Sequence, residues 1–206
     1  MNEKTLEKIN FDKQFLDGTE KYVAGVDEVG RGPLAGPVVC CAVIMPLNED
    51  CVIEGVDDIK KVSEKKRVAL CEKIKQTAVD YVICEVSPKE IDDINILEAT
   101  KLCMKRCIEG LKVKPDVVLV DAVNIDVPYK KQPIIKGDFK SYNIGAASIV
   151  AIVYRDNLMV EYDKTYPEYK FANNKGYGTK DHINAIKEVG ACPIHRKTFI
   201  KNFLEK

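Results

Sequence analysis

Residues 25–37 read GVDEVGRGPLAGP, which joins the end of an apolar run to a turn rich in glycine and proline. The run Tyr22–Val29 predicts a strand, and the continuous apolar run Val38–Met45 predicts a second, buried strand. Because only the short turn Gly30–Pro37 separates these runs, we expect the two strands to pair antiparallel. The same short stretch therefore begins a sheet and places two adjacent acids at a strand end.

Downstream of this hairpin, helical and extended patterns alternate. In order, they predict a helix opened by the Ser63 cap and ending near Thr77, a strand Asp80–Val86, a capping box at Ser87–Glu90, a helix Ile94–Leu111, a strand Val117–Val120, a strand Gln132–Lys136, and helices Asn143–Asp163, Thr179–Val189 (closed by Gly190) and His195–Glu205. The order predicts an α/β fold with a mixed sheet flanked by helices. We expect a polar lead-in at residues 1–20, the α/β domain at 21–165 and a small helical C-terminal extension at 166–206.

Length and composition allow a single domain with a real core. The 206 residues are 46 % hydrophobic, and 32 Lys and Arg balance 32 Asp and Glu. This balance argues against a purely electrostatic nucleic-acid binder, which would be basic overall. From Lys130 onward, however, the chain has fourteen basic and eight acidic residues, and so a positive net charge. Because the whole chain is neutral, residues 1–129 carry a negative net charge of the same size. Such a split is typical of a basic surface beside an acidic pocket, although mixed helix faces also produce it.

The cysteines indicate a reducing compartment. The chain has eight cysteines, none in a CxxC motif, and two histidines, which leaves few ligands for a zinc site. We expect buried, reduced thiols. Residues 1–20 are polar, so no signal peptide is apparent, and no apolar run approaches the 18 residues of a membrane span. The expected location is the cytoplasm, without contact to a membrane.

Carboxylates stand at the ends of several expected strands. Asp27 and Glu28 end the first strand, Asp121 ends Val117–Val120, and Asp138 follows the strand near Lys136. Any one of these acids alone is more often a helix cap or a solvated turn residue. Gathered together, they would need a counter-charge, and oxygen ligands suit Mg²⁺ or Mn²⁺. Two such ions are a common means of phosphodiester hydrolysis.

Two glycine-rich loops are candidate substrate contacts. Gly30 and Gly32 permit close backbone approach, and Arg31 between them suits a phosphate or a base, although a tight hairpin also needs glycine. The second loop carries Tyr177, which could stack on a sugar or base, although a tyrosine packed under a loop is more common. Lys60 and Lys61 are candidate phosphate contacts, while most lysine pairs are simply solvated.

The quoted stretch resembles the opening signature of type 2 ribonucleases H, the ribonuclease HII family. The resemblance continues at Asp58–Ser63, Val120–Asp121, Lys136–Asp138, Ala146–Ile149, Arg155–Asp156, Lys175–Thr179 and Pro193–Arg196, and so covers nearly all of the chain after about residue 20. It implies a ribonuclease H-like fold and hydrolysis of the RNA strand of RNA–DNA hybrids. It further implies cleavage beside single ribonucleotides in duplex DNA, with Mg²⁺ or Mn²⁺. Separately, we expect a monomer, and the sequence identifies no protein partner.

The resemblance also implies residue roles. The metal-binding catalytic carboxylates would be Asp27, Glu28, Asp121 and Asp138. Gly30, Arg31 and Gly32 would sense the 2′-hydroxyl, and Tyr177 would stack near the next deoxyribose. Asp156 is the alternative fourth carboxylate, although an ion pair with the adjacent Arg155 is a sufficient explanation for it.

The chain departs from the family pattern at three positions, where Ile59, Ile152 and Asn174 replace the usual Ser, Lys and His. None of these removes an expected metal ligand. The alternatives that remain are a type 3 ribonuclease H, which typically has a long N-terminal substrate-binding domain, and a non-catalytic hybrid-binding module. A metal-buffering protein would not explain the Gly-Arg-Gly turn.

Overall fold

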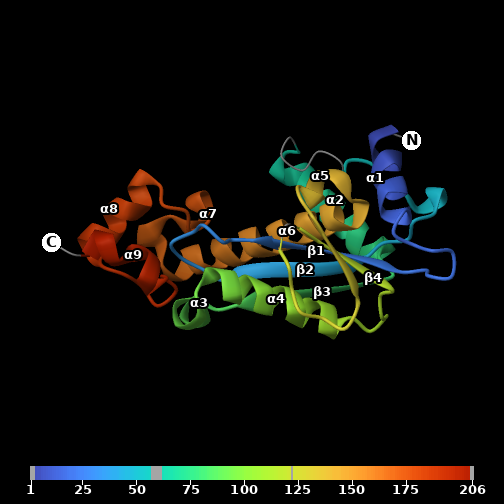
Figure 1. Ribbon diagram of the computed structural model, residues 1–206. Coiled ribbons are helices and arrows are strands. Elements are labelled where there is room, and N and C mark those ends of the chain that lie inside the picture. Colours follow the sequence, from blue (N-terminus) through green and yellow to red (C-terminus); the bar gives the residue numbers. More distant parts are fainter. Residues whose placement is uncertain (1–2, 57–61, 122, 205–206) are drawn as a thin grey trace.

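The computed structural model describes residues 3–56, 62–121 and 123–204, and its centre is one five-stranded mixed sheet (Figure 1). The strands are β1 (Val23–Val29), β2 (Val38–Ile44), β3 (Asp80–Val86), β4 (Val117–Asp121) and β5 (Lys130–Ile134), in the spatial order β3-β2-β1-β4-β5. Strands β1 and β2 pair antiparallel, as expected, and so do β2 and β3. β4 lies parallel to both β1 and β5. The mixed α/β sheet predicted from the sequence is therefore confirmed.

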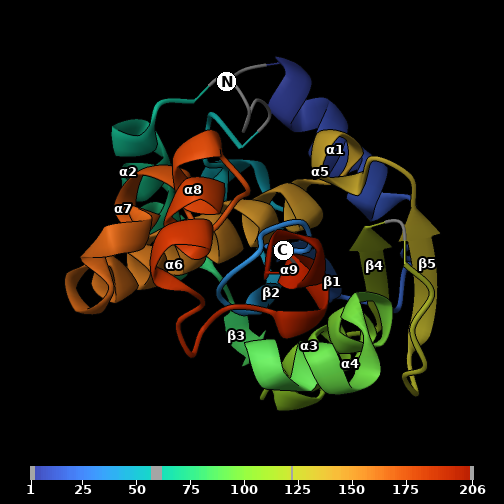
Figure 2. The same cartoon turned by 90° about the vertical axis from the view of Figure 1, so that its left-hand side faces the viewer.

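Helices cover both faces of this sheet (Figure 2). They are α1 (Glu3–Lys13), α2 (Glu64–Thr77), α3 (Pro88–Ile94), α4 (Ile96–Gly110), α5 (Gly137–Lys140), α6 (Tyr142–Thr165), α7 (Phe171–Asn174), α8 (Lys180–Val189) and α9 (Lys197–Leu204), with 3₁₀ turns at Glu49–Cys51 and Pro167–Tyr169. In the part of the chain given above, no helix is both long and apolar enough to cross a membrane.

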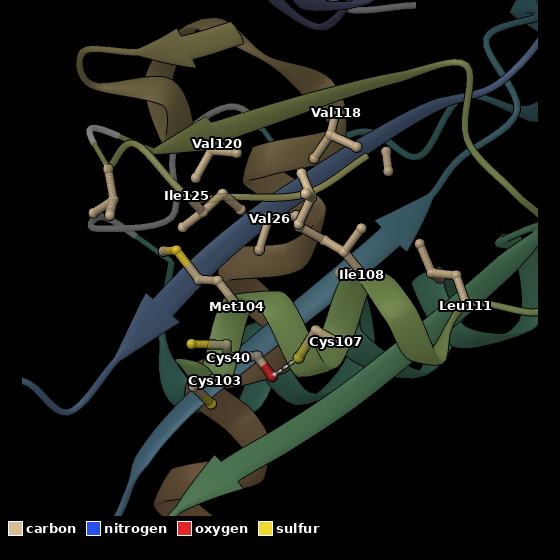
Figure 3. Close-up of a cluster of buried hydrophobic side chains, with 14 of the residues drawn as sticks. Val26, Cys40, Cys103, Met104, Cys107, Ile108, Leu111, Val118, Val120 and Ile125 are labelled. Carbon is tan, nitrogen blue, oxygen red and sulfur yellow. Dashed lines mark hydrogen bonds between the residues drawn. The ribbon is translucent and has the colours of Figure 1, made fainter. Parts of the chain in front are cut away.

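One face of the sheet packs on α4 through a tightly filled apolar cluster (Figure 3). Cys40 of β2 lies against Cys103 and Cys107 of α4, and the Cys107 thiol donates to the carbonyl of Cys40 at 3.2 Å. All eight cysteines are free, and five of them are buried. The expectation that most of the cysteines are buried is confirmed.

The opposite face packs on α6, the longest helix. Gly25 of β1 makes this contact close, since a Cβ there would lie 2.2 Å from the carbonyl carbon of Asn143. The helix is opened by Ser141, whose hydroxyl accepts the N–H of Ile144. The small residues at the start of α6 are buried on β1 and β2, and this brings Ser148 to the carboxyl end of β1. Figure 1 shows α6 running along the molecule from the region of α5 to the C-terminal helices.

Several boundaries differ from the sequence-based expectation. The helix expected at Ile94–Leu111 begins at Ile96, because Asn95 has a positive φ of 68° and caps α4 with its side chain. β5 begins and ends two residues before the range Gln132–Lys136. The four-residue helix α5 was not predicted, since its length leaves no periodic pattern. The lead-in contains α1, which buries Ile9, Lys8 and Asp12.

The residues after Tyr166 pack on the turn that follows β1. Ala35 of this turn shares a buried cluster with Phe171, Ile186 and Ile200, and it pairs with His195 in an isolated antiparallel bridge. The helices α7, α8 and α9 gather at one end of the molecule, and α1 lies at the other (Figure 1). The C-terminal helices therefore form part of the surroundings of the Gly-Arg-Gly turn.

Candidate active site

The carboxyl ends of two neighbouring parallel strands bring Asp27 and Asp121 together. In the register of β1 and β4, Val26 lies opposite Val120, and each is followed directly by its acid. The Asp121 carboxylate accepts the N–H of Gly137 at 2.7 Å. A Cβ on Gly137 would lie 3.1 Å from that carboxylate oxygen and 2.6 Å from Cδ1 of Ile144, so glycine allows this close approach. This contact draws Asp138 to the same edge of the sheet.

Asp27 is the most deeply buried of these acids, at 5 % exposed. Burial raises the pKa of its carboxyl well above the usual value, and the negative charges of Glu28 and Asp121 raise it further. A hydrogen bond from Ser148 and the N–H of Glu28, which donates to Oδ1 at 2.8 Å, oppose this rise. The mutual effect on pKa shows that the three carboxylates lie within electrostatic reach of one another.

Glu28 has a similar environment with one cation nearby. Burial raises the pKa of its carboxyl, Arg31 lowers it, and Asp121 raises it. Oε1 lies 3.4 Å from Nη1 of Arg31, whereas the buried Oε2 has no hydrogen-bond partner among the described residues. A buried, unpartnered carboxylate oxygen costs free energy unless a ligand or ion satisfies it.

The donor set fits a hard divalent cation, because it consists of carboxylate oxygens with surplus negative charge. Across residues 3–56, 62–121 and 123–204, no three His, Cys, Asp or Glu side chains are already arranged to hold a metal ion. Asp27 and Glu28 instead use their oxygens on the N–H of Glu28 and on Arg31. A bound cation would therefore have to compete with these two contacts.

Asp138 and Asp156 differ clearly in their surroundings. The backbone carbonyl of Asp138 accepts from the buried ammonium of Lys8 at 2.7 Å, and Lys8 also donates to Val56 at 3.1 Å. Asp156 lies 3.8 Å from Arg67 of α2. The expected ion pair between Asp156 and Arg155 is not formed, because the Arg155 guanidinium points to backbone carbonyls.

The Gly-Arg-Gly turn and the Tyr177 loop, two segments far apart in the sequence, lie side by side. A Cβ on Gly32 would lie 3.7 Å from Cε1 of Tyr177, and the N–H of Leu34 donates to Gly176 at 2.8 Å. The Tyr177 ring is 46 % exposed, so it is available for stacking. Arg31 and Gly32 are exposed, whereas Gly30 is buried.

The only two histidines of the chain hold the Tyr177 loop from beneath. The N–H of Cys192 donates to Nδ1 of His195 at 2.9 Å, so the proton of His195 lies on Nε2. This Nε2 donates to Nε2 of His182 at 2.9 Å, and Nδ1–H of His182 then donates to the carbonyl of Tyr177 at 2.9 Å. The order of donors requires both rings to be neutral. Burial lowers the pKa of both rings, that of His195 to about 4.

The three departures from the family pattern have different outcomes. Asn174 stabilises the Tyr177 loop, since its amide donates to Tyr169 at 2.6 Å and its oxygen accepts the N–H of Gly176 at 2.8 Å. Ile152 of α6 is partly buried and packs against the core, where an apolar side chain is suitable. Ile59, Lys60 and Lys61 lie outside the described residues.

Sequence reasoning missed the residues that support the site from behind. Ser148, Lys8, Arg155 and Arg196 are all buried polar residues, and they contact carboxylates or backbone carbonyls of the candidate site. A signal was present for three of them, because Ser148, Arg155 and Arg196 lie in motifs that carry the family resemblance. The sequence does not show that their side chains point inward.

Comparisons with known proteins point to one family. The family model described as ribonuclease HII matches residues 24–202. Curated ribonucleases HII from Ruminiclostridium cellulolyticum and Clostridioides difficile are 50 % and 52 % identical over 204 residues, covering 98 % of this chain and 79 % of each relative. The crystal structure of the ribonuclease H2 from Pyrococcus horikoshii is 27 % identical, with a TM-score of 0.75, and the match covers 90 % of this chain and 100 % of that one.

Proposed function

The chain belongs to the ribonuclease HII family, endonucleases that hydrolyse the RNA strand of RNA–DNA hybrids, and we propose that it also nicks duplex DNA on the 5′ side of single ribonucleotides. The observation that carries this proposal is the close contact between the Gly30–Gly32 turn and the exposed ring of Tyr177, directly beyond the acids of β1. A single 2′-hydroxyl is a small feature, and close backbone approach beside a stacking ring suits its recognition.

We assign the acids Asp27, Glu28, Asp121 and Asp138 to the binding of two divalent cations, Mg²⁺ or Mn²⁺. Surplus negative charge at Asp27 and Glu28 and the unpartnered Oε2 of Glu28 support this assignment. When bound, such ions supply a water nucleophile and stabilise the leaving 3′-oxygen, which yields 5′-phosphate and 3′-hydroxyl ends. The chain itself supplies a fixed edge of the sheet, which sets the spacing of the carboxylates.

The neighbouring loops would bind and orient the nucleic acid. Arg31 would meet the backbone or the 2′-hydroxyl, and Tyr177 would stack on the adjacent deoxyribose. Lys60 and Lys61 would add contacts to phosphates. The partners are therefore RNA–DNA hybrids and ribonucleotide-containing duplex DNA. Eight free thiols support action in the reducing cytoplasm.

The experiment is cleavage of an end-labelled DNA duplex with one ribonucleotide, in Mg²⁺, in Mn²⁺ and in EDTA. We expect a nick on the 5′ side of the ribonucleotide in both metals and none in EDTA. An all-DNA duplex controls for contaminating nucleases, and Asp121→Asn controls for the assigned site. Cleavage restricted to hybrids with several ribonucleotides would contradict the proposal and favour a specificity like that of type 3 enzymes. Binding without any cleavage would indicate a hybrid-binding module.

A further inference from the structure

Arg196 is buried behind the Gly-Arg-Gly turn, with 0 % of its surface exposed. All three of its guanidinium nitrogens donate to carbonyls of this turn. Nη2 contacts Gly30 at 2.5 Å, Nη1 contacts Arg31 at 2.9 Å, and Nε contacts Gly36 at 3.0 Å. One side chain thus fixes the orientation of three peptide groups in the turn that the proposed function places against the ribonucleotide.

Arg155 of α6 binds the next part of the same turn and is 1 % exposed. Its Nη2 donates to Ala35 at 3.1 Å and its Nε to Pro37 at 3.0 Å. Its Nη1 donates to the carbonyl of Lys175 at 2.8 Å, in the loop of Tyr177. The guanidinium therefore holds the turn and the stacking loop at a fixed distance from each other.

These two guanidinium groups are not neutralised by carboxylates. In the stretches of chain that the structure covers, neither arginine lies within ion-pair distance of an acid, and each uses its three nitrogens on carbonyl oxygens. Burying a guanidinium is costly unless its donors are satisfied. The carbonyls must therefore point inward, so that both buried guanidinium groups have acceptors. The conformation of the turn thus depends on Arg155 and Arg196.

This inward direction of the carbonyls determines what faces outward. In a trans peptide, C=O and N–H point in opposite directions, so the carbonyls of Gly30 and Arg31 orient the N–H groups of Arg31 and Gly32 away from Arg196. No acceptor for these two N–H groups is found within the described ranges, and both residues are exposed. The outer side of the turn thus offers two preset donors.

Two glycines of the turn, Gly30 and Gly36, leave space for the side chain of Arg155. Gly30 has a φ of +90°, and a Cβ there would lie 2.2 Å from Nε of Arg155. Gly36 has a φ of +84°, and its Cβ would lie 3.2 Å from Nη2 of the same guanidinium. The absence of side chains at Gly30 and Gly36 therefore allows the guanidinium of Arg155 to approach the backbone of the turn closely.

We propose that Arg155 and Arg196 are positioning residues for substrate recognition. Their forked donors hold the Gly30–Pro37 turn so that the N–H groups of Arg31 and Gly32 face the ribonucleotide, and Arg155 keeps this turn aligned with Tyr177. The inference rests on the proposed function, since it concerns the same turn. It predicts that these residues affect substrate binding more than the hydrolytic step.

The test uses the variants Arg196→Met and Arg155→Met, which keep an unbranched stem but lose the fork, together with Arg196→Lys and Arg155→Lys. Steady-state kinetics on the single-ribonucleotide duplex should show KM raised at least about tenfold and kcat lowered less than about threefold, because the carboxylates are untouched. The Lys variants should be intermediate, since an ammonium keeps the charge but cannot bond three carbonyls at once.

Two controls separate positioning from general stability. Arg106→Met removes an exposed arginine of α4 that pairs with Glu90, and it should leave KM unchanged. Ile108→Ala removes a buried side chain of α4 and lowers Tm without touching the turn, so a fall in stability alone should not raise KM. Circular dichroism and thermal unfolding establish that each variant is folded.

Each outcome decides the inference. Folded Met variants with the wild-type KM would overturn it, and so would Lys variants that restore KM fully, because charge alone would then suffice. If the Met variants do not fold, the Lys variants decide in the same way, with a raised KM in support and a wild-type KM against. If the unmodified chain cuts no single-ribonucleotide duplex, the proposed function fails instead, and the two failures are distinct.

Discussion

The acids at the ends of β1 and β4 form a buried negative group, and the arginine pair behind the Gly30–Pro37 turn forms a buried positive one. The chain satisfies the hydrogen-bonding groups of these two clusters differently. Each arginine places all three nitrogens on backbone carbonyls. The acids keep an unpartnered oxygen on Glu28 and repel one another. Burial raises the pKa of Asp27 and Glu28, this repulsion adds to the rise, and Arg31 opposes it at Glu28.

The difference separates two kinds of buried charge. The arginine pair is complete within the folded chain, so it acts as part of the framework. The acidic group is incomplete, and its interactions are optimised only when positive charge is added. Removing one arginine of the pair should therefore disturb the backbone that the pair holds. Removing one acid of the acidic group should affect only the chemistry of the site.

The largest expected effect follows from removing one acid. Asp27→Asn or Asp121→Asn should lower kcat by about three orders of magnitude or more, because essential groups of one catalytic unit do not substitute for one another. The fold should remain intact, and Tm in EDTA should equal or exceed that of the unmodified chain, because a repulsive buried charge has been removed. Turnover assays and thermal unfolding check both parts. Near-wild-type turnover in either variant would contradict the assignment.

Divalent cations should stabilise the acidic group and leave the arginine pair unaffected. At a concentration about 100 times the dissociation constant, Mg²⁺ or Mn²⁺ should raise the free energy of unfolding by roughly 2.7 kcal/mol. The stabilisation should be largely lost in Asp27→Asn and kept in Arg196→Met. Thermal unfolding with and without each cation measures this directly. Equal stabilisation of the Asp27→Asn variant would show that the cations bind elsewhere.

Tyr177→Ala should give a smaller loss, because it removes only a stacking surface. Stacking of a base on an aromatic ring contributes about 1–3 kcal/mol, which corresponds to roughly 5- to 150-fold in kcat/KM. The loss should be greater on a single-ribonucleotide duplex than on a continuous hybrid. Tyr81→Ala, at an exposed tyrosine of the edge strand β3, is the matched control. Unchanged kinetics on the single-ribonucleotide duplex would exclude a role for the ring.

The smallest expected effect concerns acid stability of the Tyr177 loop. His182 and His195 are held neutral, so the unfolded chain takes up protons before the folded one as pH falls below about 6.5. Their stabilising contribution is complete above that value and is lost as pH falls toward 4, the pKa of His195. Tm of the unmodified chain should thus fall more steeply over this range than that of His195→Gln.

One acid outside the site opposes this trend. Burial raises the pKa of Asp12 to about 6. Its contribution to the stability of the fold is therefore present at low pH and is lost as pH rises toward 6. The quantity to compare is therefore the difference in Tm between the unmodified chain and His195→Gln at each pH, rather than the Tm profile of either one alone. Parallel profiles for the unmodified chain and His195→Gln would contradict the neutral histidine pair.

Local features of the chain were predictable from the sequence. The strands β1 to β4, the Ser87 capping box and the acids at the ends of β1 and β4 all follow from patterns within a few residues. The break at Asn95 depends on one positive φ value, and α5 has only four residues, so neither produces a periodic pattern. Such short features are set by tertiary contacts, such as that between Gly137 and Asp121.

The supporting side chains were not predictable, because their partners are far away along the sequence. Arg155 contacts Pro37 across 118 positions, and Lys8 contacts Asp138 across 130. A buried arginine surrounded by carbonyls has no sequence pattern of its own, since the carbonyl is common to all residues. The direction in which Asp156 points was also misjudged, because Arg155 bonds backbone carbonyls rather than its neighbour.

The span between Gly30 and Arg196 has a consequence for the order of events during synthesis. The contact closes a loop of 166 positions, and it cannot form until the ribosome has released Arg196 from its exit tunnel. A nascent chain that has just completed α6 already contains Asp27, Glu28, Asp121 and Asp138, but the turn that we propose for recognition lacks the guanidinium of Arg196. On this proposal, the acids are present before the turn that selects the substrate takes its final shape.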